Sequence, residues 1–104
     1  MTRYITLVRL TEQGAKQIQQ STARAAAFNK AAEKLGVRVE AQYWTVGALD
    51  GVLILSADGE EKILQALTLL TSAGNVRTES LRALDAKEFD AIAGAITDPG
   101  KGVN

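Results

Sequence analysis

The sequence predicts a single α+β domain built on a four-stranded antiparallel sheet, and three observations support this fold class. The 104 residues are enough for one hydrophobic core and too few for two. Segments with the alternating period of strands are separated by segments with the apolar spacing of helices. Their order is strand, helix, strand, strand, helix, strand, followed by a last helix. This βαββαβ order is the ferredoxin-like arrangement, in which right-handed crossovers place both main helices on one face of the sheet.

The first part of the chain predicts a strand and a broken helix. Thr11 is a typical helix cap, and an alanine-rich run with helical spacing follows as far as Gly36. Because Ser21 can cap a second helical piece, we expect a break near Gln20. The strand before Thr11 alternates between two faces, with Ile5 and Leu7 on one face and Tyr4, Thr6 and Val8 on the other.

The middle of the chain predicts a hairpin. Residues 37–46 alternate apolar and polar side chains, which is typical of an edge strand with one dry face. Gly47 begins a short turn, and residues 51–57 then form an almost continuously apolar strand. Such a strand is normally buried on both faces of a sheet, so we expect something to cover each face of residues 51–57.

A helix and the fourth strand come next. Asp58, with Glu61 three residues later, resembles a capping box for a helix that ends before Gly74. Residues 75–84 predict the strand. The apolar stripe of the helix consists of Ile63, Ala66, Leu67 and Leu70.

The chain ends with a capped helix and a polar segment. Asp85 and Glu88 repeat the capping-box spacing ahead of this helix. Residues 98–104 combine helix breakers with little to bury, so we expect a flexible tail after one domain at residues 1–97. One face of the terminal helix carries Phe89, Ile92, Ala93 and Ile96.

The predicted topology leaves one face of the sheet without a helix. Four strands of about six residues present a face on the order of 300 Å² in projection. Soluble monomers seldom leave a much larger apolar patch uncovered. We therefore expect a second copy of the chain to cover this face; the alternative is that the terminal helix crosses it within one chain.

The charge balance narrows the class of partners. Twelve basic and twelve acidic residues give a formal net charge of zero, which removes the attraction that a basic domain has for nucleic acid or an anionic membrane. No apolar run approaches the roughly 18 residues of a membrane span, and no charged-then-apolar leader begins the chain. We expect no nucleic-acid partner, no membrane partner and a cytoplasmic location.

Cysteine and histidine are both missing, which restricts the possible chemistry. Their absence removes thiolate nucleophiles, the imidazole base of hydrolytic triads, the usual zinc sites and a proximal-histidine haem. The sequence accordingly predicts no metal and no cofactor. Carboxylates, Tyr, Lys, Arg and hydroxyls are the side chains left for catalysis or binding.

Three segments together resemble a known family. They are residues 4–8 followed by Thr11, Gln13 and Gly14, the turn at residues 45–50, and the polar run at residues 75–82. With these segments the chain resembles the GYD-domain family of small bacterial proteins over residues 3–93.

The resemblance implies a fold and an assembly rather than an activity. It implies membership of the dimeric α/β-barrel group, in which two ferredoxin-like sheets pack by their open faces; the family's function is generally unassigned. In the tripeptide that names the family, Gly corresponds to Gly47 or a near neighbour and Asp corresponds to Asp50. Leu49 occupies the Tyr position, so a role of a tyrosine hydroxyl does not transfer to this chain.

The fourth strand supplies the candidate catalytic and ligand-binding residues. Arg77 and Glu79 are two residues apart and share one face of the strand, with Thr78 between them. They predict a polar cavity in which Arg77 and Thr78 bind a small carboxylate or enolate, while Glu79, with a raised pKa, moves a proton. The alternative is a structural ion pair whose partners lie across a subunit boundary.

The hairpin supplies candidates for an interface. Tyr43 and Trp44 are adjacent, so in a regular strand they point to opposite faces. We expect Tyr43 to line the ligand site and Trp44 to contact a partner, with a ligand-stacking wall as the alternative for Trp44. Leu53 and Leu55 of the apolar strand are predicted to lie in the interface between copies.

Two functional hypotheses follow. The first is an uncharacterised assembly or small-ligand-binding module that works as a homodimer or higher oligomer. The alternative is a cofactor-independent oxygenase or isomerase acting on a small aromatic or enolisable compound, a hypothesis that rests on fold analogy.

Overall fold

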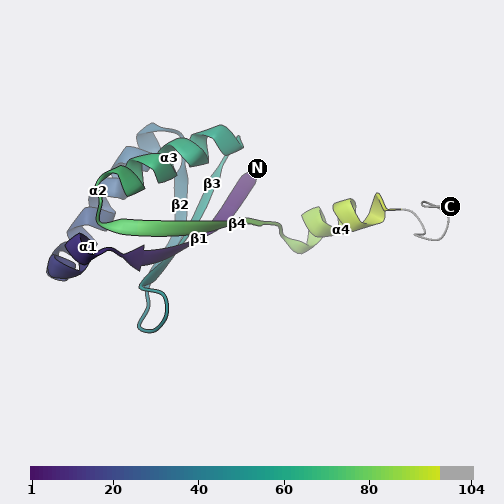
Figure 1. The fold of residues 1–104 in the computed structure, drawn as a ribbon. Helices are drawn as coiled ribbons and strands as arrows, with labels where there is room; N and C mark the ends of the chain where they lie inside the picture. The colour runs from purple at the N-terminus through teal and green to yellow at the C-terminus, as the bar shows by residue number, and fades with distance from the viewer. Residues whose placement is uncertain (97–104) are drawn as a thin grey trace.

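The computed structural model describes residues 1–96, and in them a four-stranded sheet carries two long helices on one face, while a last helix projects from the sheet (Figure 1). The predicted tail at residues 98–104 lies outside the described residues. The elements are β1 (Thr2–Leu10), α1 (Glu12–Lys16), the 3₁₀ turn η1 (Ile18–Gln20), α2 (Ser21–Lys34), β2 (Arg38–Trp44), β3 (Gly51–Ala57), α3 (Glu60–Ser72), β4 (Val76–Ala83) and α4 (Ala86–Gly94).

The sheet has the predicted ferredoxin-like topology. Its strand order is β2-β3-β1-β4, and all three pairs are antiparallel. β2 is an edge strand, as its alternating pattern indicates, and a register shift between Val39 and Ala41 interrupts its pairing with β3. The α+β fold class is thus confirmed, and the sheet of the single chain stays open rather than closing into a barrel.

Local signals placed most of the helix boundaries correctly. The hydroxyl of Thr11 accepts a hydrogen bond from the Gly14 amide and caps α1. The helix breaks before α2, near Gln20 as expected, but Ser21 is the first residue of α2 and donates to the Ile18 carbonyl instead of capping. Gly36 follows α2 with a φ of 83°, the left-handed conformation that glycine adopts most easily.

The two predicted capping boxes had different outcomes. Asp85 and Glu88 form one: the Glu88 amide donates to Asp85 at 2.8 Å, and the Asp85 amide donates to Glu88 at 2.9 Å. The box at Asp58 was wrong, because α3 begins one residue later, with Gly59 as its cap and no side-chain cap bond. Asp58 instead lies 3.9 Å from the ammonium group of Lys62.

The hydrophobic core lies between the sheet and the helices α2 and α3. Leu53 and Leu55 of β3 point into it, and the side chains of Leu55 and Ile63 are fully buried. The other core residues are Phe28, Ala32, Val37, Ala57, Ala66 and Leu67.

The terminal helix does not cover the open face of the sheet. α4 follows β4 and extends away from the sheet rather than folding back across it (Figure 1). The alternative in which the terminal helix crosses the sheet is therefore not what the structure adopts, and within residues 1–96 no helix covers the face opposite α2 and α3.

Candidate functional site

The open face of the sheet is the first candidate surface, and the strand register identifies its residues. Directly opposed residues of neighbouring strands point to the same face. Leu53 and Leu55 point to the helices, so their neighbours Val52 and Ile54 point to the open face. The apolar centre of the open face consists of Ile5 and Leu7 (β1), Ala41 (β2), Val52 and Ile54 (β3), and Leu81 (β4).

Charged side chains flank this apolar centre at one end. Arg9 lies directly opposite Arg77, and Glu79 lies directly opposite Leu7, so all three charged side chains share the open face. All three are exposed, and none of the ion pairs within residues 1–96 involves them. Like charges opposite one another weaken a strand pair, and Arg9 and Arg77 make no ion pair within the described chain, although Glu79 lies on the same face.

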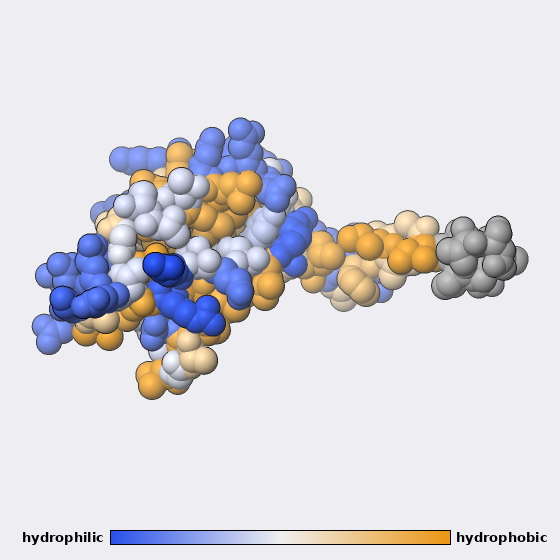
Figure 2. All heavy atoms as spheres, in the orientation of Figure 1, coloured by the Kyte–Doolittle hydropathy of each residue, from blue (hydrophilic) through white to orange (hydrophobic). Residues whose placement is uncertain are grey.

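Helix α4 carries exposed apolar side chains beyond the sheet. Phe89 and Ile92 are three residues apart in the helix, Ile96 lies two residues past its end, and all three are exposed. Figure 2 shows this projecting segment as largely hydrophobic. A helix of nine residues is marginal in water without packing, so its exposed apolar face is an unusual feature for a single chain.

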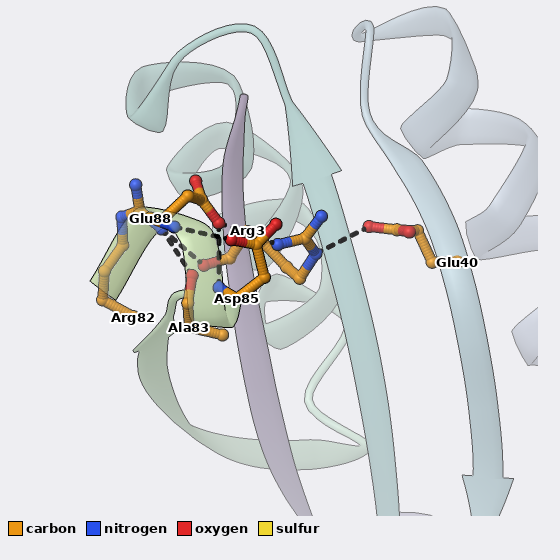
Figure 3. A network of polar contacts seen from close by, with 6 residues as sticks. All are labelled: Arg3, Glu40, Arg82, Ala83, Asp85 and Glu88. Atoms are coloured by element: carbon orange, nitrogen blue, oxygen red, sulfur yellow. Dashed lines mark hydrogen bonds and ion pairs between the residues drawn. The ribbon is translucent and has the colours of Figure 1, made fainter. Parts of the chain in front are cut away.

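A polar network joins the first turn of α4 to the sheet (Figure 3). The guanidinium of Arg3 lies between two carboxylates, 3.3 Å from Glu40 and 3.3 Å from Glu88. The guanidinium of Arg82 donates to the Arg3 carbonyl at 3.2 Å and to the Ala83 carbonyl at 2.7 Å. These contacts set the direction in which α4 leaves β4.

The same network shifts two pKa values. The hydrogen bond to Glu40 raises the pKa of Arg3, and the charge of Glu88 adds to this effect. The pKa of Glu40 is lowered, first by the neighbouring hydroxyl of Ser56 and then by Arg3. Ser56 Oγ is buried beside this carboxylate but has no partner of good hydrogen-bond geometry within the described chain, so the contact with Arg3 is the better-defined one.

A groove on the helix-covered face is the second candidate surface. It has a volume of about 550 Å³ and lies at the end of the sheet where β1 ends and β3 begins, between α2 and the end of α3. Arg24, Gln42 and Asp50 are among its polar residues. Its mainly apolar lining includes Val8, Ala25, Phe28, Trp44, Leu53 and Leu70.

The structure separates the residues that the sequence grouped into one polar cavity. Arg77 and Glu79 are exposed on the open face, whereas Thr78 lies opposite Val8 on the helix-covered face. None of the three lines the groove. The reason is the alternation of a strand, which sends Thr78 to the face opposite its two neighbours.

The hairpin residues are likewise divided between the two faces. Tyr43 lies opposite Val52 and thus on the open-face side of β2, whereas Trp44 lies opposite Gly51 on the helix-covered side; both residues are more than half exposed, and both line the edge of the groove. Leu53 and Leu55 lie in the core, and Val52 and Ile54 are the residues of β3 that point to the open face. Sequence reasoning missed Ile5, Leu7 and Leu81, although the alternation around them was visible, because the pattern does not say which face the helices cover.

A metal centre and a membrane-spanning helix are two further possibilities for the part of the chain that the structure describes. Within residues 1–96, no group of three or more Asp or Glu side chains has the arrangement of a metal site. No helix in this part of the chain has the length and apolarity that crossing a membrane requires.

Comparison with known proteins identifies a family. The family described as GYD domain matches residues 4–93. The chain is also 33% identical over 92 residues to a protein of Thermus thermophilus named glutamine synthetase and cystathionine beta-lyase binding protein, a match that covers 88% of this chain and 97% of that relative. No solved structure matches the chain significantly. Because the family matches 90 of the 104 residues, the chain belongs to the GYD domain family.

Proposed function

We propose that this protein is a non-catalytic binding module whose working unit is a pair of chains packed through the open faces of their sheets. We further propose that this pair binds other proteins. The observation that carries the proposal is the open face itself: an apolar centre drawn from all four strands, with two helices on the opposite side and α4 directed away from it.

The size of the surface supports pairing. Four strands of seven to nine residues give a face on the order of 400 Å² in projection. A standard protein interface buries about 800 Å² of accessible surface on each partner. We propose that the exposed apolar side chains of α4 take part in the same interface, which brings its area closer to that of a stable one.

The charged end of the open face supports a symmetric arrangement. In a two-fold interface, residue i of one copy contacts residue j of the other, and j contacts i in return. Arg9 and Arg77 repel one another within a chain, and Glu79 is the neighbouring acid on the same face. Pairing that brings Glu79 of the partner subunit towards Arg77 relieves this repulsion twice, once in each copy.

The protein-binding part of the proposal is supported by the relative from Thermus thermophilus, whose name states that it binds two enzymes. The catalytic alternative has less support. Glu79 is exposed on the open face, and the carboxylate among the described groove residues, Asp50, accepts a hydrogen bond from the Leu10 amide at 2.8 Å. An acid–base group within a closed cavity, which that alternative needs, is not found in residues 1–96.

The pairing is tested by Leu81→Asp. Leu81 is 52% exposed on the open face, so the single chain tolerates the change, whereas pairing would bury one carboxylate per copy. Burying an unpaired charge costs several kcal/mol per ion, and about 1.4 kcal/mol is tenfold in affinity, so the dissociation constant should rise at least roughly 1,000-fold. Leu64→Asp is the matched control, because Leu64 is 49% exposed on α3, away from the open face.

Size-exclusion chromatography with light scattering gives the readout. We expect twice the chain mass for the wild type and for Leu64→Asp, and the mass of one chain for Leu81→Asp. A wild type that is monomeric at micromolar concentration, or a Leu81→Asp variant that is still paired, would refute the pairing.

The protein-binding part has its own test. Immobilised wild-type protein should bind purified glutamine synthetase or purified cystathionine beta-lyase saturably in an interferometry assay, with bovine serum albumin as the unrelated control. If neither enzyme binds more than albumin does, this part of the proposal is refuted while the pairing stands.

A further inference from the structure

We propose that the groove beside α2 binds a small, flat, apolar acid, with its ring against Trp44 and its carboxylate at Arg24. Most of the groove lies on the helix-covered face, and at its edge the lining includes Tyr43 and Val52, which belong to the open-face side of their strands. The residues proposed to hold the ligand, Arg24 and Trp44, belong to one chain, so the site does not require pairing.

The size and lining of the groove fit a small molecule. Its volume of about 550 Å³ falls within the range of about 300 to 1,000 Å³ that is typical of ligand sites. Small residues keep it unfilled: Ala25 lies on its α2 wall, and Gly51, directly opposite Trp44, places no side chain on its floor. The groove is therefore open because small residues occupy these positions, and not because large side chains pack poorly there.

The aromatic residues favour a flat ring. Trp44 is 53% exposed although it borders the groove, and Phe28, which is buried, is a second aromatic residue of the lining. A half-exposed indole next to an apolar groove offers a stacking surface that a planar ligand can cover. Such a ligand would remove from water both its own ring and the exposed side of Trp44.

The polar groups of the groove offer hydrogen-bond donors at one end. Arg24 donates to the Gln17 carbonyl at 2.8 Å, which holds its position, and a guanidinium has five N–H groups in all. Arg24 takes part in none of the ion pairs within residues 1–96. The Gln42 carbonyl oxygen accepts from Asn29 at 3.2 Å, which leaves the amide N–H groups of Gln42 as donors.

Charge also determines the orientation of the ligand. Arg24 is the one cationic residue and Asp50 the one anionic residue among the described lining of the groove. A carboxylate is attracted to Arg24 and repelled by Asp50, so the acid should lie at the α2 side and the ring should extend from it along Trp44.

The test uses two probes with one ring, 1-naphthoate and the neutral 1-naphthalenemethanol. Equilibrium dialysis measures their affinity, and quenching of fluorescence from Trp44, the single tryptophan, reports contact with the groove. We expect saturable binding of naphthoate with quenching, and weaker binding of the alcohol.

Two variants and a matched control locate the site. Arg24→Gln should weaken naphthoate binding at least tenfold while leaving the alcohol unchanged, and Ala25→Phe, which fills the groove, should weaken both probes at least tenfold. Lys30→Gln removes a cation from the same helix outside the groove and should change neither. If Ala25→Phe does not fold, as judged by circular dichroism, Arg24→Gln alone decides the result.

Three outcomes would overturn the proposal. They are no saturable naphthoate binding by the wild type, equal affinity in Arg24→Gln and wild type, or loss of binding in Leu81→Asp, which would place the probe on the open face. Leu81→Asp is designed to remove the proposed pairing and leave the groove intact. A failure of the pairing therefore appears in the mass measured by light scattering, whereas a failure of the ligand site appears in naphthoate binding.

Discussion

Replacing Leu55 by alanine should destabilise the fold itself rather than an association between chains. Leu55 has an exposed fraction of 0% and lies on β3, where it packs in the core beneath α2 and α3. Truncating a buried leucine to alanine costs about 2 to 5 kcal/mol, because the lost transfer energy is joined by the energy of the cavity left behind. The tight enclosure of Leu55 leads us to expect about 3 kcal/mol.

Urea unfolding followed by circular dichroism measures this loss. With a slope of about 1.5 kcal/mol per molar urea for a chain of this size, a loss of about 3 kcal/mol lowers the midpoint by about 2 M. Ile54→Ala is the matched control: Ile54 is the next residue on the same strand and points to the open face, where it is half-buried. We expect a smaller loss for Ile54→Ala, of about 1 kcal/mol.

Both substitutions should also be made in the Leu81→Asp background, because any pairing of native chains adds to apparent stability in a concentration-dependent way. The loss caused by Leu55→Ala should remain there, since it arises within one chain. If Leu55→Ala costs less than about 1 kcal/mol, the placement of Leu55 in the core is refuted. If the loss of stability disappears in the Leu81→Asp background, Leu55 acts between chains, as the sequence alone predicted.

Three further predictions concern the helices and the polar network. Asp85→Ala should lower the protection of α4 amides from hydrogen exchange by an amount equivalent to about 1 kcal/mol, because the helix loses its cap. Asp85→Asn should keep most of the wild-type protection, because Asn caps nearly as well, and equal losses in the two variants would argue against capping. Gly14→Ala should cost several kcal/mol in urea unfolding, because its Cβ would lie 2.0 Å from the Asn75 carbonyl oxygen. The control Gly94→Ala, with open space around it, should be neutral or slightly stabilising, and a neutral Gly14→Ala would contradict the close approach of α1 to Asn75, the residue before β4. The pKa of Glu40 is lowered, first by Ser56 and then by Arg3, so its contribution is present above pH 4.5 and is lost as the pH falls through the folded-state pKa. Acid should therefore destabilise the wild type more than Glu40→Gln in unfolding curves measured on both sides of pH 4.5, and parallel pH profiles would show that the contacts of ionised Glu40 do not stabilise the fold.

The elements themselves were largely predictable, because their signals are local. The cap at Thr11, the left-handed glycine at Gly36 and the Asp85–Glu88 box each depend on a few neighbouring residues, and all three formed. Asp58 shows the limit of such signals. A side chain caps only from the residue directly before the helix, and a shift of one residue in the start of α3 made Gly59 the cap.

The candidate site was less predictable, since it depends on which face of each strand is covered. The sequence by itself determined that Arg77 and Glu79 share a face and that Thr78 and Trp44 point away from their neighbours, because alternation is a property of any strand. Only the tertiary structure decided that the face of Leu53 and Leu55 lies under α2 and α3 while that of Val52 and Ile54 is open. Both sets are apolar, so burial energy does not distinguish them within the strand. The right-handed crossover connections place α2 and α3 on one face. The other face is open because α4, whose Glu88 contacts Arg3 of β1, does not fold back across it.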